Sequence, residues 1–415
     1  MADLGWVGVK RRRDEDVFPV FLWSQILGCL SHLDPAVVGS FRQVCSRLRT
    51  IRAAWPTFII RDERSRSIFY RLASRSAIRN LGLEGCDDDF PDISEVRARR
   101  LAVNVASKDP LCLPLNPACL NYLSASNSTC KVGFQLQNLD LCSNLTMLCL
   151  SPVTFAEARL HCSSLPSLEA IRFHFSNASE EEFQSFRLPP MPHLQSAQLS
   201  SVCRKVWGVD ILFPVDGLEL QPKLQVLDLS FCAVPSSLRC RELLFLNLTL
   251  HRTMTILSVL EVVSECPKLR QIRLSRPAFV ATQPVPKQLK LCCSRLALSR
   301  CAEGEDLRFL PSLPDLNKLQ VVGKFVLTET LVAQLSQLRR LETFMLDQAS
   351  VDTSCDLSSL RFLRELALVN LGTHLQYGNQ VLSMSWLQSL DLRLTSRPGE
   401  LEAEVKKKFS LIIRL

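Results

Sequence analysis

Residues 224–229 read Leu-Gln-Val-Leu-Asp-Leu, and the spacing of these leucines decides the fold of the chain. In an extended strand, successive side chains point to opposite faces, so Leu227 and Leu229 share one face. Val226 and Asp228 then share the other face. The stretch therefore predicts a short strand that buries its leucines and exposes the residues between them.

The same L-x-x-L-x-L pattern recurs from about residue 78, with conservative apolar replacements. Clear copies begin at Leu145, Leu168, Leu224, Leu269, Leu363 and Leu387. Further copies begin at Ile78, Leu194, Leu243, Cys293 and Leu341, and weaker ones at Ala98, Leu120 and Leu319. These starts, about fourteen in all, are spaced by roughly 24 residues, which is the period of leucine-rich repeats.

A single unit cannot bury its leucines, whereas stacked units form one continuous core. The expected fold is a leucine-rich-repeat solenoid (horseshoe) of about fourteen degenerate repeats over residues 78–395. Each strand should be followed by a helical or irregular return segment. Residues 255–265 (TILSVLEVVSE) predict one return helix, and residues 396–415 predict a C-terminal capping helix.

The cysteines fit such a core. The chain has 17 cysteines, an odd number, without a C-x-x-C pair, so neither a zinc knuckle nor a redox motif is visible. Most fall at positions in phase with the repeat. Cys232 follows the first leucine of its unit by eight residues, and Cys266 precedes its own by three. This favours free thiols packed in a core, as in a reducing compartment.

The N-terminal part has a different pattern. Residues 18–51 read FPVFLWSQILGCLSHLDPAVVGSFRQVCSRLRTI. Leu22, Ile26 and Leu30 recur at helical spacing and predict one amphipathic helix. Asp34 followed by Pro35 is a good N-cap and first-turn pair, so a second helix should begin there.

These residues closely resemble an F-box, the helical module that docks a protein onto the adaptor of a cullin–RING ubiquitin ligase. Cysteine-containing leucine-rich repeats are commonly joined to such a module. One position departs from the family pattern, since Phe21 stands where a Glu is usual. The resemblance implies adaptor contact, or support of the contact surface, by Phe18, Pro19, Leu22, Ile26, Leu30, Val37, Val38, Val44 and Leu48.

The expected fold class is therefore α/β, with an N-terminal helical F-box before the solenoid. We expect a disordered charged tail over residues 1–17, the F-box-like module over 18–60 and a helical linker over 61–77. The alternative is that the N-terminal hairpin only caps the repeats.

A search for chemistry finds no nucleophile elbow, zinc-protease motif or phosphate-binding loop. We therefore expect neither an enzyme nor a cofactor or metal site. Function should then reside on the strand-lined face, where Arg and aromatic side chains are typical contacts. The sequence proposes Arg172, Phe245, Arg273 and Arg295 as concave-face contacts for a protein substrate.

The formal net charge of +8 is modest and does not indicate nucleic acid. No apolar run reaches the length of a membrane span. The expected function is substrate recognition in an SCF-type ubiquitin ligase, with adaptor and cullin as partners through the F-box. The alternative is a non-ligase repeat scaffold or inhibitor. Residues 10–13 (KRRR) are a short import-signal candidate or a solvated tail, so the expected location is cytoplasmic, nuclear or both.

Overall fold

The computed structural model describes residues 57–71, 78–85, 93, 95–129, 133–175, 186–201, 204–206, 209–211, 213–230, 232–233, 238–249, 256–275, 291–301, 307, 309–352, 354–370 and 383–393. The chain divides into two compact units. The first comprises residues 1–129 and 134–145, and the second comprises residues 130–133 and 146–415. The F-box-like residues 18–51 and the predicted capping helix at 396–415 lie outside the described residues.

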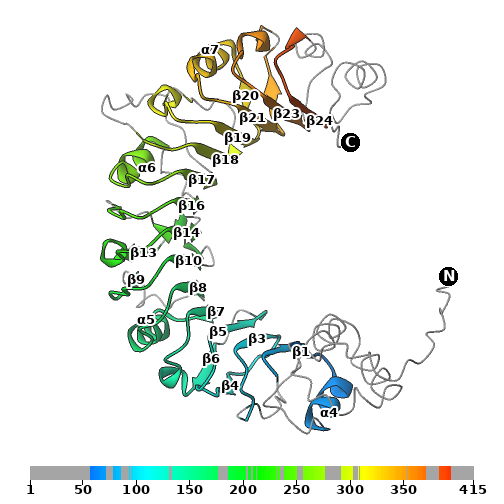
Figure 1. Cartoon of the computed structure of the whole chain (residues 1–415), viewed down its shortest axis with the longest axis vertical. Helices are drawn as coiled ribbons and strands as arrows, with labels where there is room; N and C mark the ends of the chain where they lie inside the picture. The colour runs from blue at the N-terminus through cyan, green and yellow to red at the C-terminus, as the bar shows by residue number, and fades with distance from the viewer. Residues whose placement is uncertain are drawn as a thin grey trace, which may run out of the picture. The chain divides into compact units, whose positions relative to one another are not determined.

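The first unit is built on parallel strands (Figure 1). Its main sheet has the order β1 (Thr57–Ile60), β2 (Asn80–Glu84), β3 (Arg100–Val105) and β5 (Tyr122–Asn127). A second ladder pairs β4 (Leu111–Pro114) with β6 (Phe134–Gln137), and α4 (Glu63–Arg71) and the 3-10 turn η2 (Leu139–Leu141) complete the unit. The strand at 57–60, which the sequence interpretation grouped with the F-box-like module, pairs with β2 of the first repeat.

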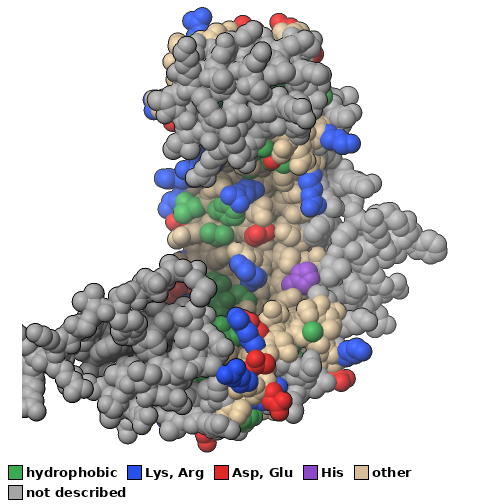
Figure 2. Space-filling model, turned by 90° about the vertical axis from the view of Figure 1, so that its right-hand side faces the viewer, with side chains coloured by type: hydrophobic (Ala, Val, Ile, Leu, Met, Phe, Trp, Pro, Cys, Tyr) green, Lys and Arg blue, Asp and Glu red, His purple; other side chains and the backbone are tan. Residues whose placement is uncertain are grey.

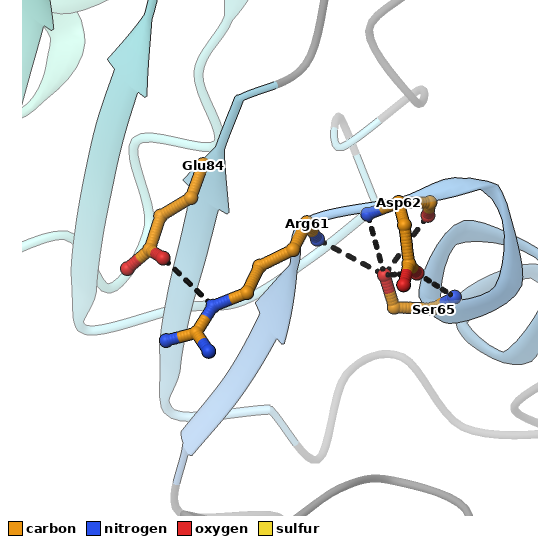
Figure 3. A network of polar contacts seen from close by, with 4 residues as sticks. All are labelled: Arg61, Asp62, Ser65 and Glu84. Carbon is orange, nitrogen blue, oxygen red and sulfur yellow. Dashed lines mark hydrogen bonds and ion pairs between the residues drawn. The ribbon is translucent and has the colours of Figure 1, made fainter.

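Helix α4 begins at a reciprocal cap (Figure 3). The backbone N–H of Ser65 donates to the Asp62 carboxylate at 2.7 Å. The Ser65 hydroxyl in turn accepts from the backbone N–H groups of Arg61 and Asp62. These bonds satisfy donors that a helix start otherwise leaves unpaired. The predicted linker 61–77 thus contains a real helix, whereas residues 72–77 lie outside the described part.

The second unit has a long main sheet of parallel strands. In spatial order they are β7 (Met147–Val153), β8 (Ala170–Phe175), β10 (Ser196–Ser201), β14 (Val226–Ser230), β16 (Phe245–Thr249), β17 (Gln271–Ser275), β18 (Arg295–Cys301), β19 (Lys318–Gly323), β21 (Thr343–Asp347), β23 (Glu365–Val369) and β24 (Ser389–Arg393). Each strand pairs in register with the equivalent strand of the next repeat, for example Leu227 with Leu246.

Return segments connect each of these strands to the next. Among the described residues, the helices are α5 (Phe155–Ser164), α6 (Ile256–Val263) and α7 (Glu329–Gln337), and the 3-10 turns are η4 (Leu218–Leu220), η5 (Leu310–Ser312) and η6 (Leu357–Ser359). Short ladders join β9 (Phe186–Arg187), β13 (Phe213–Asp216) and β15 (Cys232–Ala233), as well as β20 (Val326–Leu327) and β22 (Ser350–Val351). β11 (Arg204–Val206) and β12 (Val209–Ile211) form an antiparallel hairpin. The three helices lie on one side of the strands (Figure 1).

The core follows the leucine pattern. Leu224, Leu227 and Leu229 are at most 1% exposed, and the equivalent positions of the neighbouring repeats are buried in the same way. Helix α6 turns Ile256, Val259, Leu260 and Val263 inward, as its sequence predicts. The strands and helix α6 therefore bury their apolar residues as the pattern predicts, and the fold class of the repeats is confirmed as a leucine-rich-repeat array.

One predicted repeat frame is wrong. The sequence placed a weak copy at Leu319, which would bury position 324, but Lys324 is exposed. The buried set is instead Leu316, Leu319 and Val321, so this unit begins three residues earlier. Leu319 fits two positions of the pattern by sequence, and only the strand register with β18 selects between them.

Candidate interaction surface

The outward side chains of the main sheet in the second unit form one surface, which we call the repeat face. Each strand contributes the residues on either side of its second buried apolar position and the residue after its third. On β17 these are Gln271, Arg273 and Ser275, which are exposed or half-buried and alternate with the buried Ile272 and Leu274. Figure 2 shows this strand-lined side, with Lys and Arg side chains among uncharged ones.

The structure brings together three of the four residues that the sequence proposed as substrate contacts. Phe245, Arg273 and Arg295 lie on the adjacent strands β16, β17 and β18. Arg172 lies on β8, separated from β16 by β10 and β14, and its Nε donates to the Gln198 side chain at 2.5 Å. Arg172 therefore belongs to a different part of the repeat face.

Arg273 is held by its neighbour. Its guanidinium carbon lies 5.4 Å from the centre of the Phe245 ring, within the range of a cation–π contact. Such a contact stabilises the cation by about 0.5–1 kcal/mol at an exposed site. The Phe245 ring therefore supports the guanidinium and is partly covered by it.

Two further cations complete this group. Lys318 lies directly opposite Arg295 in the register of β18 and β19, and Arg270 immediately precedes β17, three residues before Arg273. We call Arg270, Arg273, Arg295 and Lys318 the basic strip. Sequence reasoning missed Lys318 because the wrong frame at Leu319 put it outside the strand. In the corrected frame it occupies the same outward position as Arg295.

The described residues around the basic strip do not neutralise it. All four of its side chains are exposed. Of the carboxylates that the structure describes, none forms an ion pair with Arg270, Arg295 or Lys318. On the described strands β16 to β19, no outward position is Asp or Glu. As far as the described residues go, the charge of the strip is therefore exposed and unpaired.

Carboxylates appear on either side of the strip. On one side Asp228 lies on β14, where its carboxylate accepts from the Ser230 hydroxyl at 3.3 Å. On the other side Asp347 accepts from the Asn370 amide at 2.9 Å, and Glu365 accepts from the Thr343 hydroxyl at 3.1 Å. The repeat face thus has a basic centre between two acidic borders.

The face also includes His174, whose Nδ1 lies 2.9 Å from the Ser200 hydroxyl. Burial lowers the pKa of His174 below its usual value. In a catalytic triad, a third group orients the imidazole that serves as base to the serine. Within the described part of the chain, no carboxylate contacts His174.

Most of the described thiols lie in the core, whereas Cys112 and Cys292 are exposed. Burial raises the pKa of Cys162, Cys240 and Cys293 to about 12 each, and that of Cys142 to about 11. A thiolate is the reactive and metal-binding form, and the raised pKa disfavours it at neutral pH. Where side chains are placed, no group of three or more His, Cys, Asp or Glu could hold a metal.

None of the helices that the structure describes is long and apolar enough to cross a membrane.

Comparisons with known proteins give weak similarities. No protein-family model matches the chain, and no curated protein matches it significantly. An internalin (InlF) from Listeria monocytogenes aligns at 14% identity and a TM-score of 0.43, covering 76% of this chain and 87% of that one. A protein from Bacteroides fragilis aligns at 13% identity and a TM-score of 0.32, covering 63% of this chain and 69% of that one. The repeat assignment therefore rests on the strand register and the buried leucines.

Proposed function

We propose that the chain is the substrate-recognition subunit of an SCF-type ubiquitin ligase. The observation that supports this most is the order of the sequence, in which the F-box-like residues 18–51 are followed directly by leucine-rich repeats. On this proposal the N-terminal module binds the ligase adaptor and, through it, the cullin. The repeat face binds a protein substrate.

The proposed role is positioning, without chemistry by the chain itself. A receptor that holds its substrate beside a ubiquitin-charged enzyme raises the effective concentration of the substrate lysines. Such a role needs an exposed binding face and no catalytic group on this chain. The repeat face offers Arg and Phe side chains of the kind that dominate protein interfaces. A cytoplasmic or nuclear location is part of the proposal.

Full-length variants at Leu22 and Ile26 test the adaptor contact. Leu22→Asp and Ile26→Asp place a charge on the predicted apolar face and should abolish co-purification of adaptor and cullin. Ser24→Asp, on the opposite side of the same predicted helix, is the control and should retain both. Circular dichroism should show that the repeats remain folded in all three variants.

The departure at Phe21 favours a second candidate, a repeat scaffold or inhibitor that binds proteins without a ligase. Under this candidate the wild-type chain does not co-purify with adaptor or cullin, and the three variants behave alike. If Leu22→Asp retained both partners as well as wild type does, the ligase assignment would be overturned.

A further inference from the structure

We propose that the basic strip binds a short acidic segment of a protein partner, lying extended across strands β14 to β21, with aspartate and glutamate at its centre and basic or neutral residues at its ends. This inference rests on the proposal that the repeats bind a protein, and it specifies the chemistry of that protein.

The four cations of the strip are exposed, and no carboxylate in the described part of the chain forms an ion pair with them. Arg270, Arg295 and Lys318 have no described carboxylate at ion-pair distance, and Arg273 is positioned over Phe245. Unpaired cations of one sign on neighbouring strands create a local positive potential, which a partner of opposite charge relieves. Because Phe245 already supports Arg273, less side-chain freedom is lost when that guanidinium binds a carboxylate.

The arrangement of the charges defines the partner. Arg273, Arg295 and Lys318 lie on the consecutive strands β17, β18 and β19, and Arg270 directly precedes β17. Strands in a sheet are about 4.8 Å apart, so the strip extends for about 10 Å across the sheet. A row of single carboxylates matches charges spread in this way better than one phosphate group, which concentrates its charge at a point. An acidic segment is therefore favoured over a phosphorylated residue.

The acidic borders limit the length of the segment. From Asp228 on β14 to Asp347 on β21 there are five strand steps, or about 24 Å. An extended peptide rises about 3.3 Å per residue, so about seven residues cover this distance. Residues at the ends of such a segment face Asp228 and Asp347, which disfavour further acidic groups.

The same borders disfavour a nucleic acid. A polyphosphate backbone has a negative charge at every residue and would meet the carboxylates on either side of the strip. Arg273 partly covers the aromatic ring of Phe245, which leaves less of the ring for stacking on a base. A short acidic peptide with basic ends satisfies both the centre and the borders.

The test compares two fluorescein-labelled peptides of about fifteen residues and identical composition, titrated with the full-length chain at low ionic strength. One has four acidic residues at its centre and lysines on both sides, and the other has the lysines at the centre and the acidic residues outside. We expect the first to bind at least about tenfold more tightly, because only its charge order matches the face. Equal binding of the two peptides, or no binding of either, would overturn the proposal.

The charge-reversal variant Arg295→Glu/Lys318→Glu should weaken binding of the first peptide by at least about tenfold. The milder Arg295→Gln variant should weaken binding of the first peptide by a smaller factor. It still tests the contact if the double variant does not fold. The control is Arg241→Glu/Arg339→Glu, which makes the same change in net charge. Both control residues are exposed in turns, each two positions before the first leucine of its repeat. If the control weakened binding as strongly as the double variant, the effect would be one of net charge and the proposal would fail.

Two further probes separate the alternatives. A peptide with a single phosphoserine in place of the four acidic residues, or a single-stranded RNA, should bind at least about tenfold more weakly than the first peptide. Tighter binding of either probe would refute the acidic segment. The adaptor experiment changes residues 22 and 26, whereas the peptide experiment changes residues of the basic strip. The peptide proposal can therefore be refuted while the adaptor proposal stands, and the adaptor proposal can be refuted while the peptide proposal stands.

Discussion

The Cys266 thiol donates a hydrogen bond to the carbonyl oxygen of Leu238, in the preceding repeat, with 3.0 Å between sulfur and oxygen. The same kind of contact links Cys240 to Leu218 and Cys355 to Leu327, at 3.5 and 3.1 Å. These cysteines therefore link neighbouring repeats through backbone carbonyls, two of which, those of Leu218 and Leu327, also accept a backbone N–H. The buried thiols fill the core and add hydrogen bonds between repeats.

The first prediction concerns thiol reactivity. Treatment of the native chain with iodoacetamide at pH 8 should modify the exposed Cys112 and Cys292. Cys162, Cys240 and Cys293 should stay unmodified until denaturant is added, because burial hinders access and raises the pKa of each thiol to about 12. Site-resolved mass spectrometry measures both sets. Rapid native labelling of Cys240 would contradict the burial described here.

The second prediction compares adjacent residues of one strand. Leu227→Ala removes a fully buried side chain and should lower the free energy of unfolding by about 2–5 kcal/mol. Asp228→Ala, one residue further on, changes a side chain on the repeat face and should lower the free energy of unfolding by about 0.5 kcal/mol or less. Urea unfolding followed by circular dichroism provides the comparison. Equal costs at the two positions would mean that the strand is not oriented as described.

The third prediction concerns Gly217, which has a φ of 81° and lies against the backbone carbonyl of Leu188. A Cβ at this position would collide with that carbonyl, and an L-residue would also be strained at this φ. Gly217→Ala should therefore lower the free energy of unfolding by about 2 kcal/mol or more. Gly133→Ala is the matched control, since a Cβ there meets its nearest atom, the Pro152 carbonyl oxygen, at 3.5 Å. A thermal melt in which both variants match the wild type would exclude the close approach at Gly217.

The fourth prediction concerns pH. Burial lowers the pKa of His174, so the folded state binds this proton less readily than the unfolded state, whose histidine titrates near 6.5. The contribution of neutral His174 to the free energy of unfolding is therefore complete above about pH 6.5. It decreases as the pH falls through about 6.5 toward the lower pKa of His174 in the folded state. We expect the chain to unfold at lower urea concentration at pH 5.5 than at pH 7.5. His174→Gln should reduce this difference, and an unchanged difference would show that His174 is not the group responsible.

The repeat strands could be predicted from sequence because the pattern is local. A leucine that is followed by apolar residues three and five positions later specifies both a strand and its buried face, as Leu224, Leu227 and Leu229 show. The return helix α6 was predicted for the same reason, since its apolar stripe is continuous in sequence. The exposed positions of Arg273 and Arg295 then followed from alternation alone.

Only the tertiary structure decided which of these exposed residues are neighbours. Arg172 and Arg273 occupy equivalent positions in their repeats, yet three strands separate β8 from β17, so they belong to different parts of the face. Arg295 and Lys318 are 23 positions apart in sequence and directly opposite in register, a relationship that an ambiguous leucine at 319 concealed. The physical reason is that alternation along a strand determines the direction of each side chain, whereas pairing between strands determines the side chains next to it.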